Sequence, residues 1–348
     1  MATFGQWVEG ARPRTLPAAV APVIVGTAAA YYWLAHVLSP PHAPATDVGA
    51  VTRAVTDQAA GNAFSVEAAG DPATALALSA AHATTTWSQL MVRALLALVV
   101  ALALQVGVNY SNDYSDGIRG TDEVRVGPVR LVGQGLAPAR QVQYAAFACF
   151  GVAAVAGLVL VLITQAWWLL LVGLAAIVAA WFYTGGPRPY GYAGLGELFV
   201  FVFFGLVAVA GSTYVQTLTI TATAVAGGVA CGALSVAILL ANNLRDIPTD
   251  RIHGKRTLAV RLGDHGTRIA YLCAVAAPFL VAGAIAIPDL PWALLGLLAL
   301  PLAIAPVRAV RGGAVGRDLI PVLAGTGRLL LGYSVALGAG LVLGGITG

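Results

Sequence analysis

The sequence predicts an all-α integral membrane protein with nine transmembrane helices and a polar cap at the cytoplasmic face. Of 348 residues, 59% are hydrophobic and only 10% are charged, whereas about 25% of the residues of a soluble domain are charged. Nine apolar runs approach the length needed to cross a bilayer, which is about 20 residues. Nearly all Arg and Lys residues then fall on one side of the membrane.

The nine predicted spans follow one another through the chain, which we treat as a single membrane domain, residues 1–348. They are Leu16–His36, Leu90–Tyr110, Val142–Ile163, Trp167–Tyr183, Leu195–Gln216, Thr223–Leu244, Ile269–Ile287, Trp292–Val310 and Leu329–Ile346. The first is long enough to span, and its removal would invert the charge bias, so we do not interpret it as a cleaved signal peptide.

The connections differ between the two membrane faces. Residues 37–88 form a low-complexity stretch rich in Ala, Thr, Gly and Pro, which predicts an insertion at the outer face. The other outer connections are very short, and the charged inner ones are longer. Three cysteines lie inside the spans without metal-like spacing, which indicates inert thiols.

Positive charge sets the predicted orientation. Only Arg53 and Arg93 fall on the outer side of the nine-span arrangement. Because cytoplasmic loops retain Arg and Lys, we expect the N-terminus inside the cell, the C-terminus outside, and a multi-pass protein of the plasma membrane. The net charge of +4 then reflects topology and not nucleic-acid binding.

A first acidic motif follows the second span. Asp113 and Asp116 are three positions apart and share one face if the helix continues, and Asn112 lies beside them at the apolar helix end. Two such carboxylates repel each other unless a cation lies between them. Magnesium binds one or two carboxylates together with substrate phosphates, so this spacing predicts a magnesium site.

A second acidic motif follows the sixth span. Asp246 and Asp250 are four positions apart, again on one helical face. Asparagines precede them, and basic residues lie beside and after them. These flanking residues are Asn242, Asn243, Arg245, Lys255 and Arg256. Carboxylates next to bases suit a metal-bridged polyanion, since Arg and Lys bind phosphate oxygens directly.

Both acidic motifs occupy the same membrane face, where polar groups inside apolar helix ends are costly and usually functional. Together they indicate ionisation of an allylic diphosphate, whose growing negative charge magnesium and cationic side chains neutralise. An allylic cation must then react with an electron-rich ring before water reaches it. A dry apolar cavity beneath the polar cap is therefore expected.

Two further basic sites lie on that face. Tyr183 to Tyr192 form a Gly- and Pro-rich turn in which Arg188 stands between two prolines, and we expect Arg188 to contact diphosphate or a carboxylate of the acceptor. Tyrosines at a membrane interface are ordinarily anchors, and we interpret Tyr192 in this way. Arg12 and Arg14 precede the first span and either bind the acceptor or anchor the chain.

These residues resemble the UbiA superfamily of intramembrane prenyltransferases, and within it the 1,4-dihydroxy-2-naphthoate polyprenyltransferases. The resemblance covers most of the chain outside residues 37–88. It is carried by residues 112–122, 125–130, 183–197 and 242–263.

The resemblance implies a nine-helix UbiA-type bundle in which Asp113, Asp116, Asp246 and Asp250 bind magnesium and diphosphate and are the catalytic residues, with Asp122 joining them. The implied substrates are a polyprenyl diphosphate from the lipid bilayer and 1,4-dihydroxy-2-naphthoate. The prenyl chain replaces the carboxylate, which leaves as carbon dioxide, giving demethylmenaquinone. The other candidate binding residues are Arg14, Asn112, Arg125, Arg130, Tyr183, Arg188, Asn242, Asn243, Arg245, Lys255 and Arg256.

Three alternatives remain. A related UbiA-type enzyme would use a 4-hydroxybenzoate-like or tetrapyrrole acceptor, against which residues 125–130 argue. A CDP-alcohol phosphotransferase would need its two aspartate pairs within a few turns, but Asp113 and Asp246 are 133 positions apart. A cation-coupled transporter would need ionisable groups near the membrane centre, and this sequence places nearly all of them at one face.

Overall fold

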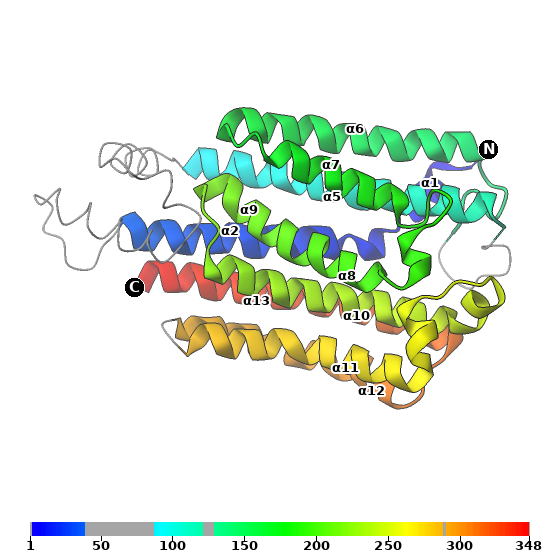
Figure 1. Ribbon diagram of the computed structural model, residues 1–348. Helices are drawn as coiled ribbons and strands as arrows, with labels where there is room; N and C mark the ends of the chain where they lie inside the picture. Colours follow the sequence, from blue (N-terminus) through cyan, green and yellow to red (C-terminus); the bar gives the residue numbers. More distant parts are fainter. Residues whose placement is uncertain (1, 39–86, 121–128, 288–289, 348) are drawn as a thin grey trace, which may run out of the picture.

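A bundle of long helices forms the protein. The computed structural model describes residues 2–38, 87–120, 129–287 and 290–347, and every regular element in these ranges is helical. Figure 1 shows the long helices running side by side, with the two chain ends at opposite ends of the bundle. The principal α-helices are α1 (Phe4–Gly10), α2 (Pro17–Leu38), α5 (Trp87–Ile118), α6 (Ala139–Thr164), α7 (Leu169–Phe182), α8 (Gly196–Val200), α9 (Ala208–Thr217), α10 (Ala222–Ile252), α11 (Leu258–Ala286), α12 (Leu300–Arg311) and α13 (Ile320–Thr347).

Shorter elements complete or join these helices. The π-helix η3 (Phe201–Val207) links α8 to α9, and four short 3-10 helices lie at turns or helix starts. These are η1 (Pro13–Thr15), η2 (Tyr190–Ala193), η4 (Pro291–Ala299) and η5 (Gly316–Leu319). Within the described ranges, eight helical segments are long and apolar enough to cross a membrane, and the shorter α7 is a further apolar helix. They coincide with the nine predicted runs and confirm the predicted fold class.

Two helices extend further than their apolar runs. The run predicted to end at Tyr110 continues as α5 to Ile118, and the run predicted to end at Leu244 continues as α10 to Ile252. The polar residues in these last turns are mostly buried and bonded to neighbouring segments, so the helices persist beyond the apolar sequence. Both acidic motifs are therefore helical, as their spacing predicted.

Helices α2, α10 and α13 form the main core. Val25, Leu234 and Leu337, one from each helix, are fully buried. Small residues let neighbouring backbones approach closely, as is common in membrane bundles. A Cβ atom added to Gly26 of α2 would lie 2.6 Å from Cβ of Ser212 on α9.

The π-helix η3 packs its backbone directly against α10. A Cβ atom on Gly205 would lie 2.5 Å from the carbonyl oxygen of Gly228 and 2.5 Å from Cα of Gly232. π-Helical turns are rare in proteins, and those that occur are often found at functional sites. Here Phe203 and Val207, on and at the end of this turn, line a cavity described below.

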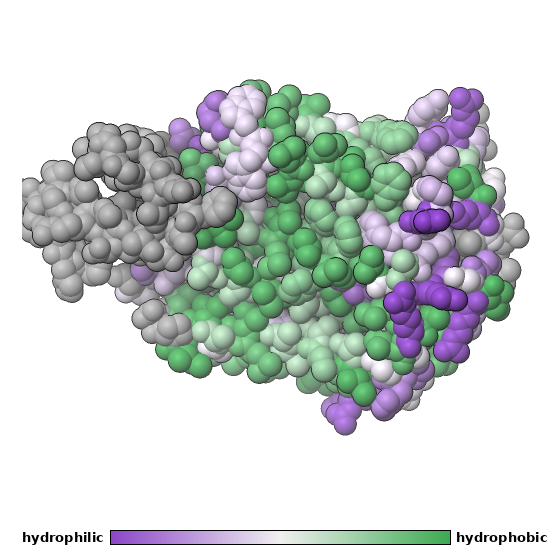
Figure 2. Space-filling model, in the orientation of Figure 1, coloured by the Kyte–Doolittle hydropathy of each residue, from purple (hydrophilic) through white to green (hydrophobic). Residues whose placement is uncertain are grey.

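The surface is divided by polarity along the bundle. In Figure 2, apolar residues cover most of the visible face and strongly hydrophilic residues gather at one end. In the matching orientation of Figure 1, α10 ends and α11 begins at that end. Most of the predicted 37–88 insertion lies outside the described residues, so its assignment, like that of a single domain, stays a prediction.

Candidate active site

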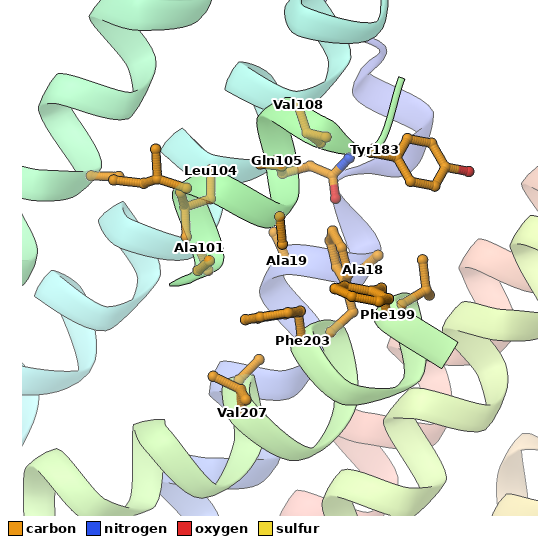
Figure 3. Close-up of a pocket in the computed structure, with 18 of the residues that line it drawn as sticks. Ala18, Ala19, Ala101, Leu104, Gln105, Val108, Tyr183, Phe199, Phe203 and Val207 are labelled. Carbon is orange, nitrogen blue, oxygen red and sulfur yellow. The ribbon is translucent and has the colours of Figure 1, made fainter. Parts of the chain in front are cut away.

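A cavity of about 610 Å³ lies between the helices, bordered by α2, α5, α6, α7, η3, α9 and α10. Its wall is mainly apolar, and Figure 3 shows Ala101, Leu104, Phe199, Phe203 and Val207 facing this space. Polar side chains line the rest of it. They are Arg12, Thr15, Gln105, Asn109, Asn112, Asp116, Arg130, Tyr183, Thr184, Tyr190, Tyr192, Ser212, Ser235, Asn242, Asn243, Asp250, Lys255 and Thr257. A polar cap over an apolar cavity is the arrangement predicted from the sequence.

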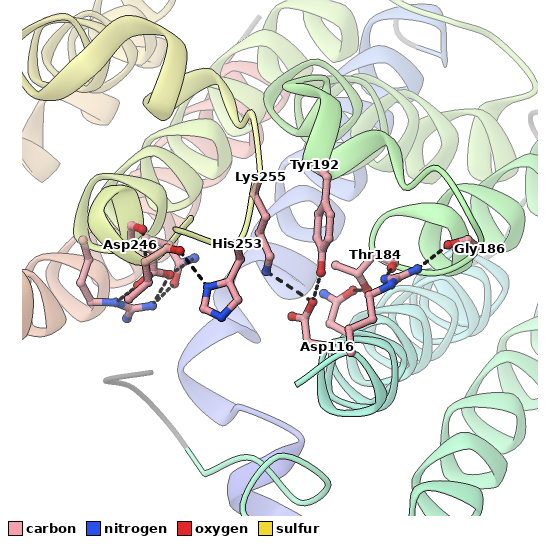
Figure 4. A network of polar contacts seen from close by, with 12 residues as sticks. Asp116, Thr184, Gly186, Tyr192, Asp246, His253 and Lys255 are labelled. Atoms are coloured by element: carbon pink, nitrogen blue, oxygen red, sulfur yellow. Dashed lines mark hydrogen bonds and ion pairs between the residues drawn. The ribbon is translucent and has the colours of Figure 1, made fainter. Parts of the chain in front are cut away.

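Asp116 of the first acidic motif contacts the segment that follows the second motif. It lies near the end of α5 and is 3% exposed. Nζ of Lys255, which follows α10, is 3.5 Å from its Oδ1, and the hydroxyl of Tyr192 donates a 2.5 Å hydrogen bond to the same oxygen (Figure 4). The Lys255 ammonium also lies 4.4 Å from the centre of the Tyr192 ring. These three residues form a buried charged cluster on the cavity wall.

Asp113 has a different environment. It is fully buried, and its carboxylate accepts hydrogen bonds from the backbone N–H groups of Leu131 (2.7 Å) and Val132 (3.2 Å). It therefore holds the segment after α5 against the helix, and it is not among the cavity-lining residues. Its neighbour Asn112 does line the cavity and accepts a 2.8 Å hydrogen bond from Thr184.

The second acidic motif is divided in the same way. Asp250 lines the cavity, whereas Asp246 does not. The carboxylate of Asp246 accepts two hydrogen bonds from Arg245, at 2.7 and 2.8 Å, in a buried ion pair. Arg245 also donates to Asn242 at 2.9 Å, so its guanidinium is held by two residues of its own helix.

A second buried contact supports Asn243. Its side-chain amide donates a 2.9 Å hydrogen bond to Glu197 at the start of α8, and both residues are buried. Tyr190, another residue of the cavity lining, donates to the carbonyl of Ala179 at 2.8 Å, and burial raises the pKa of its phenol.

Apart from Arg245, which is buried but does not line the cavity, the predicted cations in the described ranges fall into two groups. Arg130 and Lys255 are buried and line the cavity. Arg14, Arg188 and Arg256 are exposed and are not among its lining residues. The predicted residues Asp122 and Arg125 lie outside the described residues.

Two side chains at the cavity were given no firm role from the sequence. Tyr192, whose place in the sequence indicates an interfacial anchor, donates to Asp116. Arg12, and not Arg14, lines the cavity, because its left-handed backbone (φ 54°) turns the chain before η1. Arg12 adjoins a proline, and Tyr192 follows a glycine, so both stand at turns in the sequence, but neither motif shows which side chain points inward.

The residues at the cap fit a magnesium ion that is shared with a substrate. No group of three or more His, Cys, Asp or Glu side chains that could hold a metal ion occurs within the described ranges. Asp116 and Asp250 nevertheless line one cavity, and magnesium typically takes one or two carboxylates plus phosphate oxygens. The arrangement suits a cation that arrives with a diphosphate.

Comparisons with known proteins agree with this geometry. The profile of the UbiA prenyltransferase family matches residues 71–314. The chain is 48% identical to the 1,4-dihydroxy-2-naphthoate octaprenyltransferase of Mycobacterium tuberculosis, with 100% of both chains covered. Its fold is similar to that of a UbiA homolog from Aeropyrum pernix K1 (TM-score 0.56, 14% identity, 92% of this chain and 97% of that one). It is also similar to a UbiA homolog from Archaeoglobus fulgidus bound to GPP and Mg²⁺ (TM-score 0.55, 12% identity, 96% and 99%).

Proposed function

Because the chain belongs to the UbiA prenyltransferase family, we propose that it transfers a polyprenyl group from its diphosphate to 1,4-dihydroxy-2-naphthoate, releasing diphosphate and carbon dioxide. The product is the reduced, quinol form of demethylmenaquinone, which a separate oxidation converts to the quinone, so the reaction belongs to menaquinone synthesis. The observation that carries the proposal is the 48% identity, over the whole length of both chains, to an enzyme named for this acceptor. It favours the naphthoate over 4-hydroxybenzoate-like or tetrapyrrole acceptors and over a transporter.

The polar cap is the proposed diphosphate site. Asp116, Asp250 and Lys255 line the cavity there, with Asn112 and Asn242 beside them. Asp116 and Asp250 would hold a bound magnesium ion, which would supply positive charge that stabilises the leaving diphosphate. Lys255 contributes a further positive charge at the same oxygens.

The apolar wall protects the reaction. The bond between the allylic carbon and the diphosphate oxygen breaks, and its electron pair leaves with the diphosphate. Leu104, Phe199 and Phe203 line the adjoining space, where few polar atoms compete for the allylic cation. The ring carbon that bears the carboxylate then forms the new carbon–carbon bond, and loss of carbon dioxide restores the aromatic ring.

Asp113 and Asp246 stay candidate magnesium ligands, as the spacing predicts. Their contacts favour a positioning role: Asp113 holds the segment that includes Leu131, and Asp246 holds Arg245. Two arginines of the described ranges line the cavity: Arg130 is buried and Arg12 is partly buried. Their guanidinium groups are suited to binding the carboxylate of the acceptor. The exposed Arg14, Arg188 and Arg256 are placed better for attracting anions to the site.

We further propose that the protein resides in the plasma membrane with the cap on the cytoplasmic side, the N-terminus inside and the C-terminus outside. The Arg and Lys bias of the connections supports this orientation. The chain ends at opposite ends of the bundle fit it.

The test is a proteoliposome assay with magnesium, radiolabelled polyprenyl diphosphate, and either 1,4-dihydroxy-2-naphthoate or 4-hydroxybenzoate. Asp116→Asn should lose most activity, because it removes the charge at the cap. Asp264→Asn is the matched control: it makes the same chemical change at an exposed aspartate paired with Arg268, outside the cavity.

Magnesium-dependent transfer to the naphthoate alone, lost in Asp116→Asn and kept in Asp264→Asn, is the expected result. Product from 4-hydroxybenzoate instead would contradict the assigned acceptor while keeping the mechanism. Equal activity of both variants would contradict the assigned diphosphate site.

A further inference from the structure

Gln105 places an unused hydrogen-bond acceptor in the wall of the cavity. The side chain lies on α5 and is 5% exposed. Among the residues that the structure describes, none donates a hydrogen bond to its Oε1. Such buried, unsatisfied atoms are rare in proteins and require an explanation.

The orientation of the Gln105 amide is fixed by its neighbours. Nε2 donates to Oγ1 of Thr15 at 3.1 Å and to Oδ1 of Asn109 at 3.4 Å. The Thr15 hydroxyl gives its own proton to the carbonyl of Arg12 at 2.9 Å, so it can only accept from Gln105. The nitrogen therefore faces Thr15, and the oxygen occupies the other branch of the amide.

The oxygen is directed into the cavity. Figure 3 shows it turned toward the space beside Ala18 and Ala19, away from the branch that carries the nitrogen. Gln105 precedes Asn112 by seven positions on α5, which places it about 10 Å deeper in the bundle at 1.5 Å per residue. On α10, Ser235 precedes Asn242 by the same interval, lines the cavity and has a hydroxyl without a partner in the described ranges.

The chemistry of the substrates decides what this oxygen can bind. An ionised diphosphate and a carboxylate offer only acceptors, and a polyprenyl chain offers no hydrogen-bonding group. The hydroxyl groups of the aromatic ring are the remaining donors. Resting on the proposed function, we propose that Oε1 of Gln105 accepts a hydrogen bond from a ring hydroxyl of the acceptor and so orients the ring beneath the diphosphate.

The test combines a change in the protein with a change in the ligand. Gln105→Met keeps the length of the side chain and removes the acceptor oxygen. Thr15→Val is the matched control, because it removes one acceptor of Nε2 while Oδ1 of Asn109 still accepts from that nitrogen and keeps the amide in the same orientation. The ligands are 1-hydroxy-2-naphthoate and 4-hydroxy-2-naphthoate, each lacking one hydroxyl, measured as competitive inhibitors of transfer to 1,4-dihydroxy-2-naphthoate.

In the wild type, we expect the analogue that lacks the bonded hydroxyl to inhibit about 5- to 30-fold more weakly than the other, as for the loss of one buried hydrogen bond. In Gln105→Met this difference should disappear and KM for the naphthoate should rise, while KM for polyprenyl diphosphate stays unchanged and reports an intact fold. Thr15→Val should keep the difference.

Two results would overturn the inference. If the difference persists in Gln105→Met, or is lost equally in Thr15→Val, the amide acts only through the packing of η1 against α5, and the proposed function stands. If the wild type transfers no prenyl group to the naphthoate, the proposed function and the inference fail together.

Discussion

Tyr192→Phe removes one hydrogen bond from the buried carboxylate of Asp116 and keeps the aromatic ring against Lys255. A hydrogen bond to a charged group contributes about 1.5 to 3 kcal/mol, which corresponds to about a 10- to 100-fold change in rate. Lys255 stays 3.5 Å from the same oxygen and continues to hold it. We therefore expect kcat/KM for polyprenyl diphosphate to fall by about 10- to 30-fold, the lower half of that range.

The assay is the initial rate of prenyl transfer at saturating naphthoate, measured across a magnesium titration. Tyr214→Phe is the matched control, since its hydroxyl accepts a 3.2 Å hydrogen bond from Trp168 on a part of α9 outside the cavity lining. The magnesium concentration that gives half of the maximal rate should rise in Tyr192→Phe and stay unchanged in Tyr214→Phe. A rate for Tyr192→Phe within about twofold of that control would refute the reasoning, because changes of that size are usual for substitutions remote from a site.

Two further predictions concern stability. Asp113→Asn should lower the free energy of unfolding by about 1 to 3 kcal/mol, because the amide cannot accept from both backbone N–H groups as the carboxylate does. Thermal unfolding in detergent measures this loss, with Asp264→Asn as the control. Equal unfolding midpoints for the two variants would show that the contacts of Asp113 with Leu131 and Val132 do not stabilise the fold. Gly205→Ala should cost about 1 to 3 kcal/mol by overpacking against the carbonyl of Gly228. The same substitution at Gly283, where a Cβ meets nothing within 4 Å, is its control, and similar losses in both would contradict the close approach.

The membrane-spanning helices were predictable because the hydrocarbon core of a bilayer restricts which backbone structures and side chains can cross it. A segment that crosses a bilayer must satisfy its own backbone and cover it with apolar side chains, and both demands are visible in a run of about 20 residues. The continuation of α5 to Ile118 was less visible, since it depends on partners such as Leu131 that follow later in the chain.

The sequence indicated which group of residues lies at the candidate site, but not which contacts each side chain makes. Spacing placed Asp113 and Asp116 on one helix, but only the later contact with Leu131 shows that Asp113 binds the following segment while Asp116 lines the cavity. Tyr192 looks like an interfacial anchor until Lys255 is brought against its ring. Arg12 and Arg14 are equivalent in sequence, and a single left-handed backbone angle separates them.

The ion pair between Asp116 and Lys255 affects how the polar cap can bind charged ligands. While these two residues neutralise each other, neither offers an unpaired charge to a divalent cation or to an anion. If the proposed diphosphate site is right, a bound diphosphate would pair with Lys255 and free Asp116 for a cation, and each ligand would then raise the affinity for the other by the same factor. Magnesium and diphosphate that bind together would therefore replace one buried ion pair, between Asp116 and Lys255, with contacts of each residue to a ligand of opposite charge. Without substrate, the two residues neutralise each other.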